Sequence, residues 1–403
     1  MLHGRDRRQP GVAEANHCGA ERDPREEAGM TSEGSSFTMV HPGVRIVSGP
    51  GALRHTGEEA ERLGAERVLV VCGRSIAERT PALQVLREGL GSRLVETFTG
   101  VVYDTGARAD ARARMQDLAA DARPDLVVSV GGGIAIGYAR QLTLHMAGGD
   151  PAAPRTPIIT VPTTLSGAEA NVGYITVDGQ SATDSPSRPV TAILDAELAR
   201  HTPRELFLSS GFNGLHHCFE GTYSTQRNLL ADGVYLHAAR LLVQALPGVA
   251  ADPDDLEARG RALLGGYLSG LMIESTWLGI GHALCHGLQS VCGTPHGLNN
   301  TVMLTRAIRY NLAVAADRIA SLAPALGVSN GATARETAEG CISAVEELRR
   351  SLSLPDRLRD VPGVRRDLFP RVAEVAVRDF FTPYNPRSPE GLEELLQVLD
   401  EAW

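Results

Sequence analysis

The sequence contains no lysine, so all 39 of its Lys-plus-Arg positions are arginine. Without a lysine amine the chain has no Schiff-base chemistry, and a Walker-type phosphate loop, which needs a lysine, is excluded as well. A GC-rich genome explains this absence more simply than selection for function does.

Basic stripes and long apolar runs are also missing. The net charge of −9 and the scattered arginines argue against a nucleic-acid partner, and no apolar run reaches the roughly 18 residues of a membrane span. The six cysteines form no Cys-x-x-Cys pair and follow no recognisable signal peptide, so we expect reduced thiols and a cytoplasmic location. We interpret Cys218, Cys285 and Cys292 as small apolar residues rather than catalytic thiols.

The sequence does have enough length and apolar content for two domains, since 43% of its 403 residues are hydrophobic. Residues 1–37 are rich in Arg, Glu, Gly and Ser and are predicted to be a disordered tail. Met30 or Met39 could equally be the true start. We place an α/β domain at residues 38–204 and a helical domain at residues 205–403.

The first of these domains alternates short β-branched runs with amphipathic segments such as Ala107–Ala122. This alternation predicts a Rossmann-like parallel sheet with helices on both faces, which binds ligands at the carboxyl ends of its strands. The predicted strands are Val68–Val71, Leu94–Phe98, Leu126–Val130, Ile158–Val161 and Val190–Leu194.

The second domain has few strand signals and is predicted to be all-helical. In its last helix, Ser388 is the predicted N-cap and Pro389 the first helical residue. Ligand pockets form preferentially between domains, so we expect the site in the cleft between the two. The earlier predicted helices span 205–224, 228–247, 255–277, 280–292, 297–325 and 331–353.

The strand that ends near residue 130 runs into Gly131, Gly132 and Gly133, and then into a helix. Glycines let the backbone approach a pyrophosphate closely, and the free amides and dipole of the following helix attract its charge. We therefore predict a phosphate-binding turn. The alternative is a glycine turn needed only for tight strand-to-helix packing.

Histidines recur at helical spacing in the second half of the chain. His282 and His286 share a helix face, and His296 follows in a Thr-Pro-His-Gly turn. An earlier segment places Asn213 and His217 at the same i,i+4 spacing. A single histidine on an apolar helix face is usually a hydrogen-bonded core residue, but two such pairs are typical of a metal or general-acid site.

These two segments, in this order, resemble the group III, iron-type alcohol dehydrogenase family. Its pattern is Asp or Asn followed by His at plus four, then His-x-x-x-His, then Pro-His-Gly, and the likeness covers roughly residues 38–403. Within the family the sequence is most similar to the maleylacetate reductases, which also have Asn at the first position. The resemblance implies a dehydroquinate synthase-like architecture and an oxidoreductase that uses NADH or NADPH on a small-molecule substrate. We expect a homodimer.

The resemblance also assigns cofactor contacts. In the family, the threonines of a Pro-Thr-Thr loop contact the dinucleotide, which indicates Thr163 and Thr164, although both could be ordinary capping residues. Strict NAD enzymes of the family often have an acidic residue after the first strand, where this chain has Gly73 and Arg74. We expect NADPH to be accepted at least as well as NADH, with Arg74 on its phosphate, unless Arg74 is a solvated turn residue.

For the chemistry, the resemblance offers two interpretations. Family members that bind iron or zinc use the Asp and three histidines to polarise a carbonyl. Here Asn213 replaces that anion, which leaves the imidazoles of His217, His282 and His296 as ligands that could still hold Zn²⁺. The maleylacetate reductases work without metal, so we predict histidines that act as hydrogen-bond donors and acids, with His286 as the proton donor.

The sequence departs from the reductase subgroup where charge matters. Ala283 stands where the reductases commonly have Lys, and Asn300 stands where they have His. A dicarboxylate such as maleylacetate needs cations to pair its charges. We therefore give equal weight to two substrates, maleylacetate and a less charged enone, quinone-like or keto compound. Two alternatives are a lyase or cyclase, which the absent lysines disfavour, and a relative that binds a ligand without redox turnover.

Overall fold

The computed structural model describes residues 43–403 apart from 105, 151–152, 172–174, 178–179 and 183–187. The predicted tail at residues 1–37 lies outside the described residues. The described residues group into one unit, and the predicted boundary between residues 204 and 205 stays a prediction.

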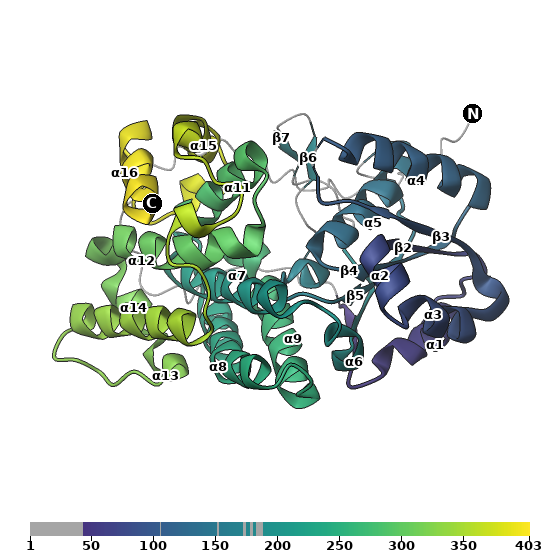
Figure 1. Cartoon of the computed structure of the whole chain (residues 1–403), viewed down its shortest axis with the longest axis horizontal. Helices are drawn as coiled ribbons and strands as arrows, with labels where there is room; N and C mark the ends of the chain where they lie inside the picture. Colours follow the sequence, from purple (N-terminus) through teal and green to yellow (C-terminus); the bar gives the residue numbers. More distant parts are fainter. Residues whose placement is uncertain (1–42, 105, 151–152, 172–174, 178–179, 183–187) are drawn as a thin grey trace, which may run out of the picture. The chain divides into compact units, whose positions relative to one another are not determined.

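A parallel sheet of six strands forms the first half of the described chain, in the order β1-β8-β5-β4-β2-β3 (Figure 1). All five predicted strands are present. β1 was not predicted, because its four residues are mostly exposed and pair with β8 only. The strands are β1 (Arg45–Ser48), β2 (Val68–Gly73), β3 (Leu94–Val101), β4 (Leu126–Gly131), β5 (Ile158–Pro162) and β8 (Thr191–Leu194), with β6 (Ile175–Val177) and β7 (Gln180–Ala182) as a separate antiparallel pair.

Helices cover both faces of this sheet, as predicted. Successive strand residues point to opposite faces. In β2, Val68 and Val70 therefore join the apolar cluster of α1 and α3, whereas Leu69 and Val71 join that of α4 and α5. The helices are α1 (Thr56–Arg62), α2 (Arg74–Arg79), α3 (Ala82–Leu90), α4 (Arg108–Ala122), α5 (Gly133–Met146) and the short α6 (Ala196–Ala199).

The second half of the described chain is mostly helical, which confirms the predicted fold class. Two of the long predicted helices are each divided into a long and a short one, and α15 was not predicted. The helices are α7 (Arg204–Tyr223), α8 (Leu229–Ala251), α9 (Leu256–Leu271), α10 (Ile273–Thr276), α11 (Ile280–Cys292), α12 (His296–Ala320), α13 (Ala323–Leu326), α14 (Ala334–Ser351), α15 (Phe369–Val377) and α16 (Leu392–Ala402).

The predicted start of the last helix is wrong. Ser388 and Pro389 precede α16, which begins only at Leu392. The amide of Glu390 donates to the Glu394 carboxylate at 3.1 Å, so a side chain of α16 itself bonds the turn before the helix. The sequence has no N-cap signal for this contact, because Glu394 lies in the first turn of α16 and accepts from a residue before the helix.

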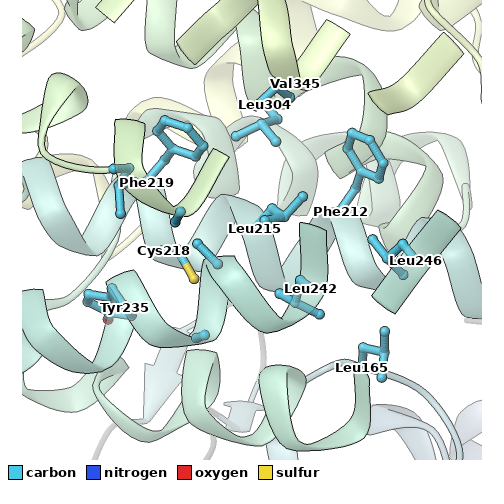
Figure 2. Close-up of a cluster of buried hydrophobic side chains, with 14 of the residues drawn as sticks. Leu165, Phe212, Leu215, Cys218, Phe219, Tyr235, Leu242, Leu246, Leu304 and Val345 are labelled. Atoms are coloured by element: carbon cyan, nitrogen blue, oxygen red, sulfur yellow. The ribbon is translucent and has the colours of Figure 1, made fainter. Parts of the chain in front are cut away.

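α8 has the length and composition of a membrane-crossing helix, with a mean hydropathy of 1.2. Its packing indicates a core helix instead. Tyr235, Leu242 and Leu246 enter the same apolar cluster as Phe212 and Leu215 of α7, and α8 lies against both α7 and α9 (Figure 2). This core fixes α7, the helix that carries the first pair of predicted site residues.

Candidate active site

A cavity of about 560 Å³ opens at the carboxyl ends of the strands. Its walls come from the ends of β2, β4 and β5 and from α7 and the start of α12. This location agrees with the rule that parallel sheets bind ligands at this edge. The predicted site residues that line the cavity are Gly73, Gly131, Gly132, Gly133, Thr163, Thr164, Asn213 and His296.

The predicted glycine turn joins β4 directly to α5. Gly131 has a φ of 142°, a conformation that favours glycine, and Gly132 is the N-cap of α5 with no side-chain cap. No capping side chain therefore accepts a hydrogen bond from the first amides of the helix, and these amides suit an anion. Close packing contributes too, because a Cβ atom on Gly132 would lie 3.0 Å from Thr164 Oγ1.

Thr163 and Thr164 follow β5 at the neighbouring strand end. The Thr163 amide donates to the Gly131 carbonyl at 3.0 Å, and the Thr163 carbonyl accepts from Thr202 Oγ1 at 2.8 Å. The loop backbone is thus fixed on both sides. Neither threonine is the N-cap of a helix, and neither hydroxyl has a hydrogen bond to a described residue, so both are available to a ligand.

Gly73 and Arg74 differ in their position relative to the cavity. Gly73 lines it, but the Arg74 side chain is 83% exposed, with its Nε 3.6 Å from a Glu78 carboxylate oxygen. The arginine that lines the cavity is Arg79, at the end of the same helix, together with Ser75. Sequence reasoning missed Arg79, although its i,i+4 spacing from Ser75 places both on one face of α2.

Helices α7, α11 and α12 bring the predicted histidines together. The ring centroid of His282 lies 4.8 Å from that of His217 and 5.7 Å from that of His296. The ring of His286 stacks on that of His296 at 5.5 Å with an interplanar angle of 23°. All four histidines selected by their spacing therefore lie in one cluster.

A ring of buried polar side chains holds this cluster in place. Glu220 accepts from His282 Nδ1 at 2.7 Å, and His282 Nε2 lies 3.2 Å from Asn213 Oδ1. Asn213 Oδ1 accepts from Asn300 Nδ2 at 3.1 Å, and Asn300 Oδ1 accepts from His216 Nδ1 at 2.6 Å. His216 Nε2 lies 3.7 Å from Glu220 Oε1, which is ion-pair distance but too long for a hydrogen bond. Because each side chain is nearly fully buried, the ring orients the imidazole of His282 and the amide of Asn213.

The four histidines divide into two kinds by their pKa. Burial, followed by the neighbouring histidines, lowers the pKa of His217, His282 and His296 well below the ordinary value. Burial also acts against protonation of His286, but Asp379 Oδ2 lies 2.8 Å from its Nδ1, and the Asp379 charge and hydrogen bond leave the pKa of His286 raised. His286 is thus the proton-holding member of the four.

The surroundings of His286 are aromatic and acidic. The rings of Phe380 and Phe381 lie 6.1 Å and 5.6 Å from its centroid, nearly parallel to it. The charged groups that shift the pKa of the four histidines are Asp379, Glu220 and the histidines themselves, with no arginine among them. A ligand beside His286 therefore meets aromatic surface and the His286–Asp379 pair.

The cysteines of the described chain are free thiols. Burial raises the pKa of Cys218 and of Cys285, which keeps both protonated. This favours the interpretation of these two as apolar packing residues. Cys18 lies outside the described residues.

Sequence reasoning missed the partners of the histidines. Glu220 is seven residues after Asn213 and faces the same way on α7, so the helical period could have found it. Asp379 lies 93 residues from His286 and has no local pattern that marks it. The contact between His216 and Asn300 spans 84 residues and is equally invisible before folding.

Comparison with known proteins agrees with this arrangement. The model of iron-containing alcohol dehydrogenases matches residues 43–196, and that of the C-terminal part of the Fe-containing alcohol dehydrogenase family matches residues 207–403. Maleylacetate reductase 1 of Rhodococcus opacus is 32% identical over 382 residues, which cover 93% of this chain and 98% of the relative.

Solved structures show the same likeness. The alcohol dehydrogenase from Oenococcus oeni has a TM-score of 0.83 and 25% identity, over 91% of this chain and 100% of that one. Maleylacetate reductase from Rhizobium sp. strain MTP-10005 has a TM-score of 0.76 and 27% identity, over 91% and 98%. The fold and these relatives together define an NAD(P)H-dependent oxidoreductase. The chain belongs to the iron-containing alcohol dehydrogenase family and is similar to its maleylacetate reductases.

Proposed function

We propose that this protein reduces a small enone, quinone-like or keto compound, with NADH or NADPH as the hydride donor. The observation that carries the proposal is a glycine-lined cavity at the strand ends whose wall includes His296, with the protonatable His286 stacked behind it. The pyrophosphate would lie at Gly131–Gly133, and the nicotinamide would lie towards Asn213 and His296.

The reaction needs a hydride and a proton. The cofactor supplies the hydride from C4 of its nicotinamide to the electron-poor carbon of the substrate, and the oxyanion or enolate that forms takes up the proton. His286 is the proposed proton donor, because Asp379 favours its protonated form. The neutral rings of His217, His282 and His296 would orient the substrate by hydrogen bonding.

A divalent cation fits this donor set only in part. His217, His282 and His296 offer imidazoles, and a metal held by them would polarise the substrate carbonyl. The fourth position is the neutral amide of Asn213, whose oxygen already accepts from Asn300 at 3.1 Å. The nearby carboxylate of Glu220 lies behind His282, 2.7 Å from its Nδ1, rather than at this fourth position. Since no carboxylate stands at the fourth position itself, we propose that turnover does not require a tightly bound metal.

The charge around the histidines favours a substrate less charged than maleylacetate. A dicarboxylate needs cationic partners. Ala283, where the reductases commonly have Lys, is fully buried in apolar surroundings. Arg79 is the one arginine among the described residues that line the cavity, and it stands at the end of α2 rather than on the helices that carry the histidines.

The proposal is tested in two steps. Fluorescence titration with NADH and with NADPH measures cofactor binding, and absorbance at the reduced-nicotinamide band then follows turnover with a neutral enone, a benzoquinone, an uncharged ketone and maleylacetate. We expect cofactor binding and faster oxidation with the neutral compounds. Binding without oxidation by any of them would favour a ligand-binding or lyase-type role, and no binding would refute the assignment. A cytoplasmic homodimer without nucleic-acid or membrane partners remains part of the proposal.

A further inference from the structure

We propose that Arg79, with Ser75 beside it, binds the 2′-phosphate of NADPH and makes NADPH the preferred cofactor. This inference rests on the proposed function and specifies which side chains bind the adenosine end of the cofactor. It replaces the interpretation in which Arg74, the first residue after β2, would hold that phosphate.

The order of the strands places the end of β2, and with it the start of α2, the short helix that ends at Arg79, beside the glycine turn. β5, β4 and β2 are neighbours in the sheet, and adjacent strands lie about 4.8 Å apart. The glycine turn at the end of β4, which suits the pyrophosphate, is therefore one strand away from the end of β2. In doubly wound folds the adenosine ribose is read at this neighbouring strand end.

Arg79 is free to meet a ligand from this position. It lines the cavity and is exposed, and it has no hydrogen bond or ion pair to any described residue. Ser75 lies one helical turn before it and also lines the cavity, so a hydroxyl and a guanidinium converge from one face of α2. By contrast, Arg74 is turned towards Glu78 and does not line the cavity.

The charge of the cavity wall supports the same assignment. Among the described residues that line it there is no Asp or Glu, and Arg79 is the one arginine. An acidic side chain at this place would bond the ribose 2′-hydroxyl of NADH and repel a 2′-phosphate. A guanidinium instead pairs well with a phosphate dianion, so the wall is complementary to NADPH.

The test compares two arginines on one helix. Dissociation constants of NADPH and NADH are measured by fluorescence for the wild type, Arg79→Ala and the matched control Arg74→Ala, each checked for fold by circular dichroism. We expect the wild type to prefer NADPH and Arg79→Ala to weaken NADPH about 10- to 100-fold, with NADH changed less than about threefold. Arg74→Ala should leave both constants close to wild type, and Arg79→Lys should recover part of the lost NADPH affinity.

Three results would overturn the assignment. If Arg79→Ala weakens NADPH and NADH equally, the guanidinium contacts the shared pyrophosphate rather than the 2′-phosphate. If Arg74→Ala, not Arg79→Ala, removes the preference for NADPH, the selective residue is Arg74. A wild type that prefers NADH contradicts the inference while the reductase assignment stands, whereas a wild type that binds neither cofactor refutes the proposed function itself.

Discussion

The two walls of the cavity are built by different means. On the sheet side, the predicted contacts to the cofactor come from the backbone of Gly131–Gly133 and from two threonines whose loop is fixed by main-chain hydrogen bonds. On the helical side, His296 lines the cavity and belongs to a cluster of histidines that lies behind it. The orientation and protonation of this cluster depend on other side chains, above all Glu220 and Asp379.

The two walls should therefore tolerate different substitutions. A backbone site tolerates changes of neighbouring side chains as long as the space near the glycines stays open. A side-chain network changes its chemistry when one partner is replaced, because buried polar groups that lose a partner are costly and their charges shift. Substitutions on the sheet side should therefore block cofactor binding. Substitutions on the helical side should instead remove proton transfer and leave the cofactor bound.

The largest expected effect is obstruction of the glycine turn by Gly132→Val. The added side chain would press on Thr164, since even a Cβ would lie 3.0 Å from its Oγ1 and 3.1 Å from its Cγ2. We expect the affinity for both NADH and NADPH to fall more than about 100-fold, measured by fluorescence titration. Gly137→Ala is the control, because a Cβ there meets nothing within 4 Å. Unchanged cofactor binding in Gly132→Val would refute the phosphate assignment.

The next effect is loss of the proton donor in His286→Ala. Removal of a general acid typically slows turnover about 100- to 10,000-fold, and we expect kcat to fall in this range with cofactor affinity within about twofold of wild type. His237→Ala, an exposed histidine on α8, serves as the control. If His286→Ala also lost cofactor binding, the proposal that the sheet side binds the cofactor and the helical side transfers the proton would be contradicted.

The sequence predicted the sheet side more completely than the helical side. Glycine and strand patterns are local, so Gly131–Gly133 and the five strands could be found within short windows. The four histidines were also found, because helical spacing marks His217, His282 and His286 and a Pro-His-Gly turn marks His296. Their partners were not, since Asp379 reaches His286 only through the folding of α15 against α11. Arg79 was missed for a related reason, because the sequence does not show which arginine of α2 faces the cavity.

A smaller effect is expected from Asp379→Asn, which keeps the shape but removes the charge beside His286. Asp379 raises the pKa of His286, and the protonated form is the active one, so activity falls as pH rises through that pKa. Loss of the charge should move the alkaline limb of the kcat/KM profile to lower pH, with little change on the acid side. Asp367→Asn, in an exposed pair with Arg365, is the control.

If the alkaline limb of Asp379→Asn stays in place while the rate falls evenly at every pH, Asp379 has only a structural role. In that case the proton donor is another group. His286→Ala, measured over the same pH range, would then retain the limb as well.

The smallest expected effect is that of metal removal. The histidine wall offers three imidazoles and the neutral amide of Asn213, so it lacks the anion that would offset part of a divalent charge. Dialysis against EDTA should therefore change kcat by less than about twofold, and elemental analysis should find zinc and iron well below one per chain. The variant Asn213→Asp supplies the missing carboxylate at the position of Asn213, whose Oδ1 lies 3.2 Å from His282 Nε2.

That variant should bind Zn²⁺ or Fe²⁺ more tightly than the wild type by orders of magnitude, because a charge–charge attraction in a nearly dry site replaces a charge–dipole one. Isothermal titration with each metal gives this readout without reference to activity. A wild type that holds near-stoichiometric zinc or iron, and whose activity is lost to a chelator and restored by added metal, would contradict the metal-free proposal. His217, His282 and His296 would then be ligands, and the helical wall would work through a cation that they hold rather than through their own protons.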